Sequence, residues 1–235
     1  MEGVVTWAEY WDGQTTIYVN ARHKRIHYEM VARDIVAFLP GPAARVVDYG
    51  CGEASSAHVV ADQCAHLFLC ESAPTTRRRL EERYRDRSDI AVISPDEFAQ
   101  LPSGTIDVII ANSVIQYLSP AALAQVLAVS RNKLSPVGCL VLADVVPRHV
   151  GVLGDASELF KFAAANGFLV AAGVGLVRSF FSSYPRIRRE LGLLRFDEAE
   201  MLEQLKRAGF DAYRRYPNLG HNQRRMAFVA TVRRD

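Results

Sequence analysis

The sequence lacks the features of several common protein classes. Its four cysteines form no Cys-x-x-Cys pair and have no regular spacing, which argues against a zinc site or a disulfide framework and favours reduced thiols in a cytoplasm. The formal net charge is only +2, so there is no electrostatic case for binding nucleic acid or an anionic membrane. The first residues, MEGVVTWAEYWDG, have neither the basic start nor the apolar core of a signal peptide.

The longest apolar run is short for a membrane span. The most apolar segment, 162–177, is interrupted by Asn166 and by glycines, and it is short for a bilayer. We therefore expect a buried or lid helix at this segment and no stable membrane insertion.

What the chain does have is a regular alternation of strand-like and helix-like segments, which predicts a parallel α/β sheet with right-handed crossovers. Several strand-like runs are almost continuously apolar, as expected of strands that are covered on both faces. Two final strands joined by a short turn predict an antiparallel hairpin. The predicted strands are 44–50, 66–72, 89–94, 105–113, 139–146, 211–217 and 225–233, and the main predicted helices are 20–39, 74–85, 119–134 and 197–209.

A single domain over 1–235 suits this length and a hydrophobic content of 49%. Residues 148–196 are too many for a simple crossover between the fifth strand and the last helix. Because they are rich in apolar helical stretches, we interpret them as a helical cap insert over a ligand site.

The clearest chemical motif is the glycine turn in VVDYGCGEASS, which follows the first strand. Gly50 and Gly52 permit a tight turn and leave room for a ligand against the backbone. Asp48 precedes the turn, and Glu71 ends the second strand, 19 residues after Gly52. An acid at that place can accept both hydroxyls of a ribose, so the order strand, GxG, helix, strand, acid predicts a nucleotide-like ligand.

This constellation resembles the first motifs of the class I S-adenosylmethionine-dependent methyltransferases. The segments SPDEFAQLPSGTIDVIIANSVIQYL and KLSPVGCLVLADV are similar to later blocks of that family, and the resemblance covers roughly 40–145 and 197–233. It implies a Rossmann-like seven-stranded, mostly parallel sheet with a terminal antiparallel hairpin, S-adenosyl-L-methionine as cofactor and methyl transfer as the reaction.

The resemblance also implies the cofactor-binding residues. They are Asp48, the turn residues Gly50, Cys51 and Gly52, the ribose acid Glu71 with its neighbour Ser72, an acid near the adenine that is either Asp96 or Glu97, and Asn112 with Ser113 beside the methyl group. Asp107 matches a position that is mostly structural in the family and is left out of the site.

Two residues depart from the family pattern. Ala54 stands where a third glycine is usual, and Val137 replaces the first glycine of a Pro-Gly-Gly turn. An added methyl at position 54 is costly only if the backbone there has a positive φ. We expect close helix-to-strand packing to accept it.

Residues 1–40 are expected to form an N-terminal helical cover, because an N-terminal helix folds over the cofactor in many family members. Arg22 is a candidate for holding the methionine carboxylate, and Tyr18 for packing on the cofactor. The alternative for both is a solvated helix face.

Methyl transfer from a sulfonium is an in-line displacement, so the protein mainly supplies proximity, alignment and exclusion of water. A general base is needed only if the acceptor must lose a proton. The candidates for that base are His149 after the fifth strand, His221 in the final turn and His23 on the first helix. No metal site is expected.

The predicted function is methyl transfer to a small, apolar or aromatic molecule. Asn-Ser-Val-Ile after the fourth strand differs from the Asn-Pro-Pro-Tyr type that resembles amino-nitrogen methylation of adenine or glutamine, which argues against nucleic acid. One alternative is a non-catalytic cofactor-binding or interaction protein, with a homodimer formed through the insert. The other, a nicotinamide-dependent oxidoreductase, requires a glycine where Ser55 stands.

Overall fold

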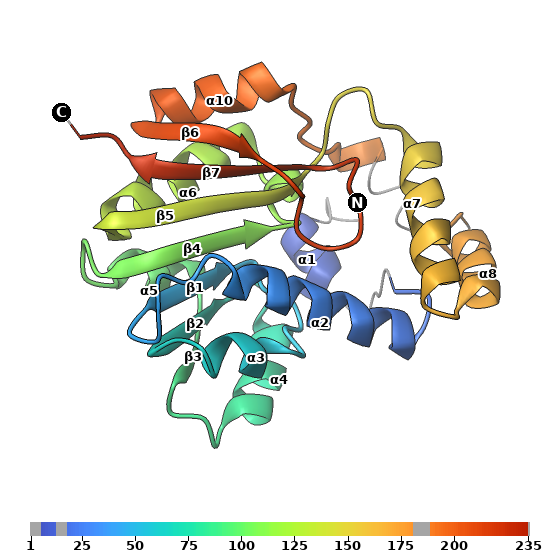
Figure 1. Ribbon diagram of the computed structural model, residues 1–235, viewed down its shortest axis with the longest axis horizontal. Coiled ribbons are helices and arrows are strands. Elements are labelled where there is room, and N and C mark those ends of the chain that lie inside the picture. Colours follow the sequence, from blue (N-terminus) through green and yellow to red (C-terminus); the bar gives the residue numbers. More distant parts are fainter. Residues whose placement is uncertain (1–5, 13–17, 181–188, 235) are drawn as a thin grey trace, which may run out of the picture.

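The computed structural model describes residues 6–12, 18–180 and 189–234. They form a central sheet with helices on both faces (Figure 1). Residues 1–5 and 13–17 of the expected N-terminal cover, and 181–188 of the expected insert, lie outside the described residues.

The seven strands of the sheet lie in the order β3-β2-β1-β4-β5-β7-β6. Strand β7 pairs antiparallel with β5 and β6, and the remaining pairs are parallel. This topology confirms the predicted Rossmann-like sheet with its antiparallel hairpin. The strands are β1 (Arg45–Tyr49), β2 (His66–Cys70), β3 (Ile90–Ile93), β4 (Ile106–Asn112), β5 (Leu134–Val145), β6 (Phe210–Arg215) and β7 (Met226–Val232).

Local capping explains where several helices begin. The Ser119 hydroxyl accepts the Ala122 N–H at 3.1 Å at the start of α6, as the Ser-Pro pair predicts. At the start of α10 the Asp197 N–H donates to the Glu200 carboxylate at 2.8 Å. The described helices are α1 (Trp7–Asp12), α2 (Ala21–Val36), α3 (Ala57–Ala61), α4 (Pro74–Tyr84), α5 (Pro95–Gln100), the 3-10 helix η1 (Ile115–Tyr117), α6 (Pro120–Lys133), α7 (Val152–Ala165), α8 (Leu169–Phe180) and α10 (Glu198–Arg207).

Two hydrophobic cores cover the two faces of the sheet. Successive strand residues point to opposite faces, so Val46 belongs to one core and its neighbour Val47 to the other. Helices α2, α3 and α4 contribute to the first core, and α5, α6 and α10 contribute to the second. Both faces are therefore covered, and the carboxyl ends of the parallel strands are left for a site.

The expected cap insert contains two helices, α7 and α8, which lie beyond the tip of the β4 arrow in Figure 1. Helix α7 ends before Asn166, and the following Gly167 has φ +70°, which separates α7 from α8. After the insert, Phe196 forms a parallel bridge to Pro147, so the chain returns to the end of β5. Among the described residues, no helix has both the length and the apolar character needed to cross a bilayer.

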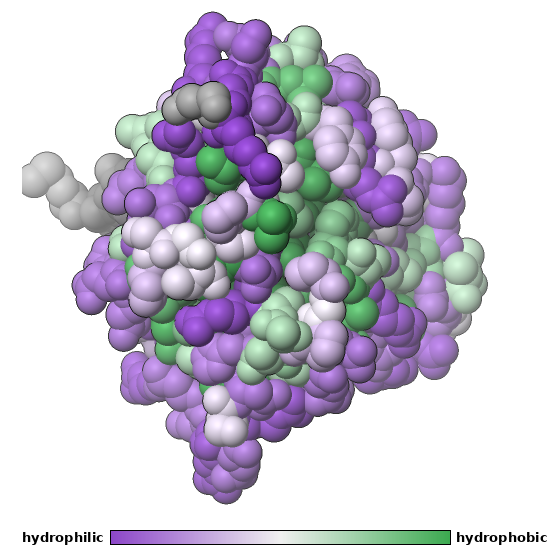
Figure 2. Space-filling model, turned by 60° about the vertical axis from the view of Figure 1, so that its left-hand side comes forward, coloured by the Kyte–Doolittle hydropathy of each residue, from purple (hydrophilic) through white to green (hydrophobic). Residues whose placement is uncertain are grey.

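Most of the face shown in Figure 2 is polar, and hydrophobic residues gather in a central hollow. Large hydrophobic side chains that are well exposed include Val137, Val170 and Tyr216. Most other large apolar side chains of the described residues belong to the two cores.

Candidate functional site

The glycine turn after β1 forms the floor of the candidate site. Gly50 and Gly52 have φ of +71° and +59°, in the region that favours glycine. A Cβ placed on Gly50 would lie 2.5 Å from Val114, the residue that follows Ser113 after β4. Glycine at position 50 is therefore required by close packing as well as by backbone conformation.

The structure corrects the expectation about Ala54. Its φ is +36°, so the third position of the turn does need the positive φ at which a methyl is costly. The turn is held in place by Tyr84, whose hydroxyl donates to the Ala54 carbonyl at 2.5 Å and accepts the Ala57 N–H at 3.2 Å. These contacts, and burial of the Ala54 methyl, offset the strain.

Glu71 is the residue that connects the turn to the second strand. One carboxylate oxygen accepts the Gly52 N–H at 2.9 Å, and the other accepts the Ala73 N–H at 2.9 Å and the Ser72 hydroxyl at 3.2 Å. The carboxylate is thus fixed against the turn at the end of β2, as a ribose-binding acid requires. Ser72 lies beside it.

Asp48 is a half-buried carboxyl at the end of β1. Burial, with a smaller contribution from the charge of Glu71, raises its pKa from 3.8 to about 7. No hydrogen bond or ion pair joins it to any other residue that the structure describes. A buried Oδ1 of Asn112 at the end of β4 likewise has no partner among the described residues. Such polar groups call for a ligand or water.

The structure distinguishes the two acids expected near the adenine. Glu97 completes a capping box at the start of α5, where its carboxylate accepts the N–H and the hydroxyl of Ser94 at 2.7 and 2.8 Å. Asp96 is exposed at the same helix start and influences the pKa of Tyr49 at the end of β1. The carboxylate of Asp96, unlike that of Glu97, is therefore not engaged in capping the helix.

The ends of β4 and β5 carry two further backbone irregularities. Ser113 and Asp144 have φ of +58° and +56°, and the Ser113 hydroxyl donates to the Asp144 carboxylate at 2.7 Å. Asn218, in the final turn, accepts the Asp144 N–H at 3.0 Å. Sequence reasoning did not include Asp144, although it ends the strand-entry block that resembles the family.

Tyr18 precedes α2, and its ring packs against His23, His27 and Tyr28 of that helix. It is hydrogen-bonded to Tyr28, and its pKa is raised to about 12 by burial, with smaller contributions from Glu53 and Asp144. The charges of Glu53, which follows the glycine turn, and of Asp144, near the end of β5, therefore both act on Tyr18. Arg22, by contrast, is exposed, and its guanidinium lies 3.8 Å from a Cβ placed on Gly167 of the insert, so it is not brought to the turn.

Two of the three candidate bases lie in one aromatic cluster, which we call the cap cluster: Tyr18, His23, His27, Phe162, Phe168 and His221. The His221 ring stacks on Phe162 at 4.4 Å and lies 6.0 Å from each of His23 and His27. Burial lowers the pKa of His23 to about 4 and that of His27 to about 3, and it also lowers the pKa of His221.

All three imidazoles of the cap cluster are therefore neutral near pH 7. His149 lies outside the cluster, exposed on the turn after β5. No group of histidine, cysteine or acidic residues in the described part of the chain is arranged to hold a metal ion.

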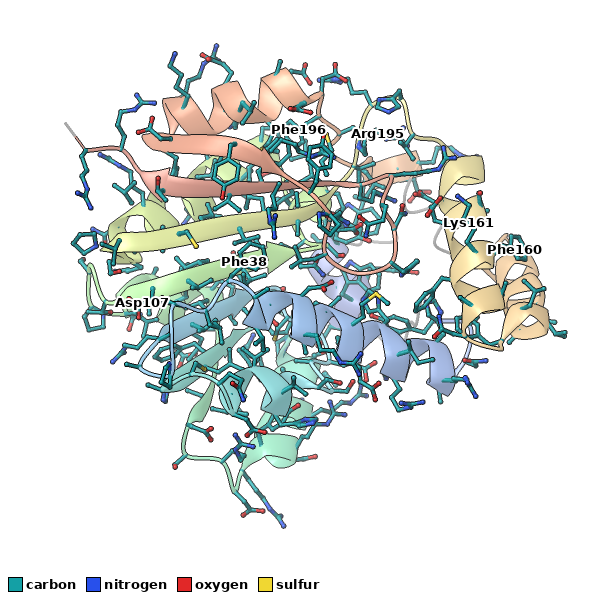
Figure 3. All side chains as sticks on the ribbon, in the orientation of Figure 1. Phe38, Asp107, Phe160, Lys161, Arg195 and Phe196 are labelled. Atoms are coloured by element: carbon teal, nitrogen blue, oxygen red, sulfur yellow. The ribbon has the colours of Figure 1, made fainter. Side chains whose placement is uncertain are left out.

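The cap is tied to the final turn by ion pairs. Arg225 binds Asp155 of α7 through two nitrogens, at 3.1 and 2.8 Å, and its Nε lies 4.0 Å from Asp144. Figure 3 shows Phe160 and Lys161 on α7 at the end of the molecule opposite to Asp107. Asp107 accepts the Arg45 N–H and the Ser135 hydroxyl, so its role is structural, as predicted.

Comparisons with known proteins agree with this geometry. Residues 47–142 match the sequence model of a family described as a methyltransferase domain. No curated protein matches the chain. Among solved structures, a chain of the complex between the Haloferax volcanii Trm112 methyltransferase activator and a methyltransferase is similar, with a TM-score of 0.62, 13% identity and coverage of 97% of this chain and 99% of that one.

Two further structures are similar in fold. One is magnesium protoporphyrin IX methyltransferase from Synechocystis PCC 6803 with bound SAH (S-adenosylhomocysteine), with a TM-score of 0.57, 17% identity and coverage of 96% and 92%. The other is the CurJ carbon methyltransferase, with a TM-score of 0.56 and 16% identity; the match covers 92% of this chain but only 56% of that one.

Residues 47–142 thus match a methyltransferase domain, and the fold around them is that of the class I S-adenosylmethionine-dependent methyltransferases. The protein is a methyltransferase, and S-adenosylmethionine is its cofactor. The residues at the strand ends fit this group, because the Asp48 carboxyl and the Asn112 oxygen have no partner in the described residues and Gly50 admits no side chain.

Proposed function

We propose that this protein transfers the methyl group of S-adenosylmethionine to a small, largely apolar or aromatic molecule. The observation that carries the proposal is the cap cluster, which lines α2, α7 and the final turn with aromatic rings. Aromatic side chains favour flat, apolar partners through stacking and edge contacts. Tyr18 belongs to this cluster, and the charges of Glu53, after the glycine turn, and of Asp144, near the end of β5, act on its hydroxyl.

The cofactor-binding roles are assigned as follows. Gly50, Cys51 and Gly52 provide the floor, and Glu71 with Ser72 binds the ribose hydroxyls. Asp96 lies nearest to the adenine, because Glu97 is engaged in capping its own helix. Asp48, Asn112, Ser113 and Tyr18 surround the methionine part, and when the cofactor is bound it supplies an electrophilic methyl group on a good leaving group.

The chain's own contribution to transfer is to align the acceptor and to exclude water. The cap helices and the final turn are joined by the Arg225–Asp155 pair, so they form one wall of the acceptor site. An acceptor that must lose a proton has two nearby bases, the Asp144 carboxylate and the neutral imidazole of His221. Burial raises the pKa of Asp144, which makes it a better proton acceptor than an exposed aspartate.

A screen with methyl-labelled S-adenosylmethionine tests this function. The labelled cofactor is incubated with the protein and with small-molecule, lipid and macromolecular fractions of a lysate. We expect label in the small-molecule fraction. Label only in protein or nucleic acid would refute the substrate class.

Glu71→Gln is the matched inactive variant for this screen. Both carboxylate oxygens of Glu71 accept backbone N–H groups, so a glutamine would place its amide N–H against one of these donors. We expect at least about tenfold weaker cofactor binding by calorimetry. Glu81→Gln, an exposed position on α4, is the control and should bind as the wild type does.

One observation favours a second use of the insert, as a homodimer interface. On α8, Val170 is 84% exposed, and a hollow of about 680 Å³ lies between α8 and the residues that precede α2. Exposed apolar surface of this kind is typical of contact sites. Light scattering of the wild type and Val170→Asp tests it: a dimer that becomes a monomer supports the interface, and a monomeric wild type contradicts it.

A further inference from the structure

Two buried nitrogen atoms of the cap cluster have no hydrogen-bond partner among the described residues. They are Nδ1 of His27 on α2 and Nδ1 of His221 in the turn between β6 and β7. The third imidazole differs, because Nδ1 of His23 accepts the Val19 N–H at 3.3 Å. A buried polar atom without a partner costs free energy, which a polar ligand recovers. The cluster therefore contains two groups that favour such a ligand.

These two nitrogen atoms belong to neighbouring rings. The ring centroids of His27 and His221 are 6.0 Å apart, and two hydrogen bonds of about 2.8 Å each span a similar length. One oxygen atom between the rings can thus reach a nitrogen of each. Both residues are partly exposed, and a small rotation about χ2, a soft torsion in histidine, turns Nδ1 toward the accessible edge of the ring. Figure 1 shows the turn that carries His221 between α2 and α7.

The hydrogen-bonding capacity of imidazole determines which group fits there. Burial lowers the pKa of both His27 and His221, so both rings are neutral near pH 7. A neutral imidazole has one N–H donor and one acceptor nitrogen. An oxygen held between a donor of one ring and an acceptor of the other must accept one hydrogen bond and donate another. A hydroxyl does both, whereas a carboxylate only accepts and an ammonium only donates.

The charges around the two rings also favour an uncharged ligand. The groups that act on His27 are the other two imidazoles of the cluster. The charges that act on His221 come from Glu158, Arg225 and Asp155. Arg225 already binds Asp155 at 2.8 Å, and Glu158 is bound by Lys161 at 2.9 Å. A charged ligand would have to compete with these pairs or stay unpaired, which is costly in a partly buried site.

We propose that the acceptor molecule carries a neutral hydroxyl group on a flat apolar ring, and that His27 and His221 bind this hydroxyl between them. The inference rests on the function proposed above, and it narrows the acceptor from aromatic molecules in general to phenols. Phe162 stacks on His221 at 4.4 Å and Phe168 on His23 at 5.2 Å, so apolar surface lies beside the two nitrogen atoms.

Four probes that share one ring separate the hydroxyl contact from the apolar contact: para-cresol, para-methylanisole, para-toluate and para-xylene. Each is titrated into the SAH-bound protein and followed by NMR. We expect para-cresol to bind about tenfold more tightly than para-methylanisole, which keeps the oxygen but donates no hydrogen bond. Para-toluate should bind no more tightly than para-xylene. The ring-nitrogen chemical shifts of His27 and His221 should change with para-cresol, and those of the exposed His58 should not.

His27→Phe and His221→Phe test each contact, because phenylalanine keeps an aromatic ring and removes both nitrogen atoms. Each variant should lose the preference for para-cresol over para-methylanisole and keep its affinity for para-xylene. Lost packing would instead weaken all four probes together. His58→Phe, on the exposed side of α3, is the matched control and should keep the preference. Circular dichroism and calorimetry with SAH verify that each variant is folded.

The outcomes separate the hydroxyl contact from the function on which it rests. A preference for para-cresol that disappears in both variants supports the contact. The contact is refuted, and the aromatic acceptor stands, if para-cresol and para-methylanisole bind equally well or if the preference survives in both variants. Bound para-cresol that leaves both Nδ1 signals unchanged has the same meaning, because the two nitrogen atoms then hold only water. If the SAH-bound wild type binds none of the four probes, the aromatic acceptor is refuted as well.

Discussion

Asp48→Asn is the substitution that most directly tests the electrostatics of the candidate site. Asp48 is half-buried, and the charge of Glu71 acts on it, so the folded protein holds its proton more tightly than the unfolded chain does. Asparagine has a similar shape and no charge. The substitution therefore removes the electrostatic cost and leaves the packing nearly unchanged.

The size of the effect follows from the two pKa values. The pKa of about 7 in the folded protein, against the ordinary pKa of 3.8, corresponds to a destabilisation of at most about 4 kcal/mol. Solvent at this half-buried position reduces that cost, so we expect Asp48→Asn to raise the free energy of unfolding by ~2–4 kcal/mol. Between these pKa values the folded state binds the proton and the unfolded state does not, so the stability of the wild type falls as pH rises. The cost is fully present at pH 8 and absent below about pH 4.

Urea denaturation followed by far-ultraviolet circular dichroism measures this difference at several pH values. The free energy of unfolding of Asp48→Asn should exceed that of the wild type at pH 8, and the two should converge near pH 4. Asp86→Asn, at an exposed position, should show no such trend. A difference between Asp48→Asn and the wild type that does not grow with pH would falsify the reasoning. Calorimetry should also show weaker SAH binding, because the stabilised variant lacks a carboxylate that we propose to bind the cofactor.

Two further substitutions test how the site is held together. Tyr84→Phe leaves two backbone groups of the glycine turn without their partner, so we expect a loss of about 1–3 kcal/mol in the free energy of unfolding and weaker SAH binding; a loss no larger than that of the exposed Tyr213→Phe contradicts this. Arg225→Lys loses the two-nitrogen contact with Asp155, so amide hydrogen exchange across α7 should be roughly tenfold faster, and unchanged exchange would mean that this pair does not hold the cap.

The sheet was predictable because its signals are local. Apolar runs located six strands to within two residues at each end, but β5 begins at Leu134, five residues before its predicted start. The Ser119-Pro120 and Asp197-Glu200 pairs located the starts of two helices. The short helix α3, which follows the glycine turn, was predicted, whereas α5 and η1 were not. The α5 capping box formed by Ser94 and Glu97 is a readable signal, but α1 depends on contacts with residues that are far away in the sequence, which no local pattern reveals.

The candidate site was predictable where the chain places residues next to a strand end. Asp48 and Glu71 lie where the motif indicates, although their roles remain predictions. Sequence spacing gave no sign that Ala54 has a positive φ, because that depends on the path of the backbone. Nor could it show that Arg22 turns toward the insert while His23, one residue later, turns toward the cap cluster.

The confinement of both tryptophans to α1 has a practical consequence for every measurement on this protein. Intrinsic fluorescence, the usual probe of protein unfolding, reports here on six residues attached to the outside of the sheet. A fluorescence melting curve will follow detachment of that helix, and it will precede loss of the β-sheet signal if the helix detaches first. The difference between the midpoint temperatures of the two melting curves measures how independently of the sheet α1 detaches.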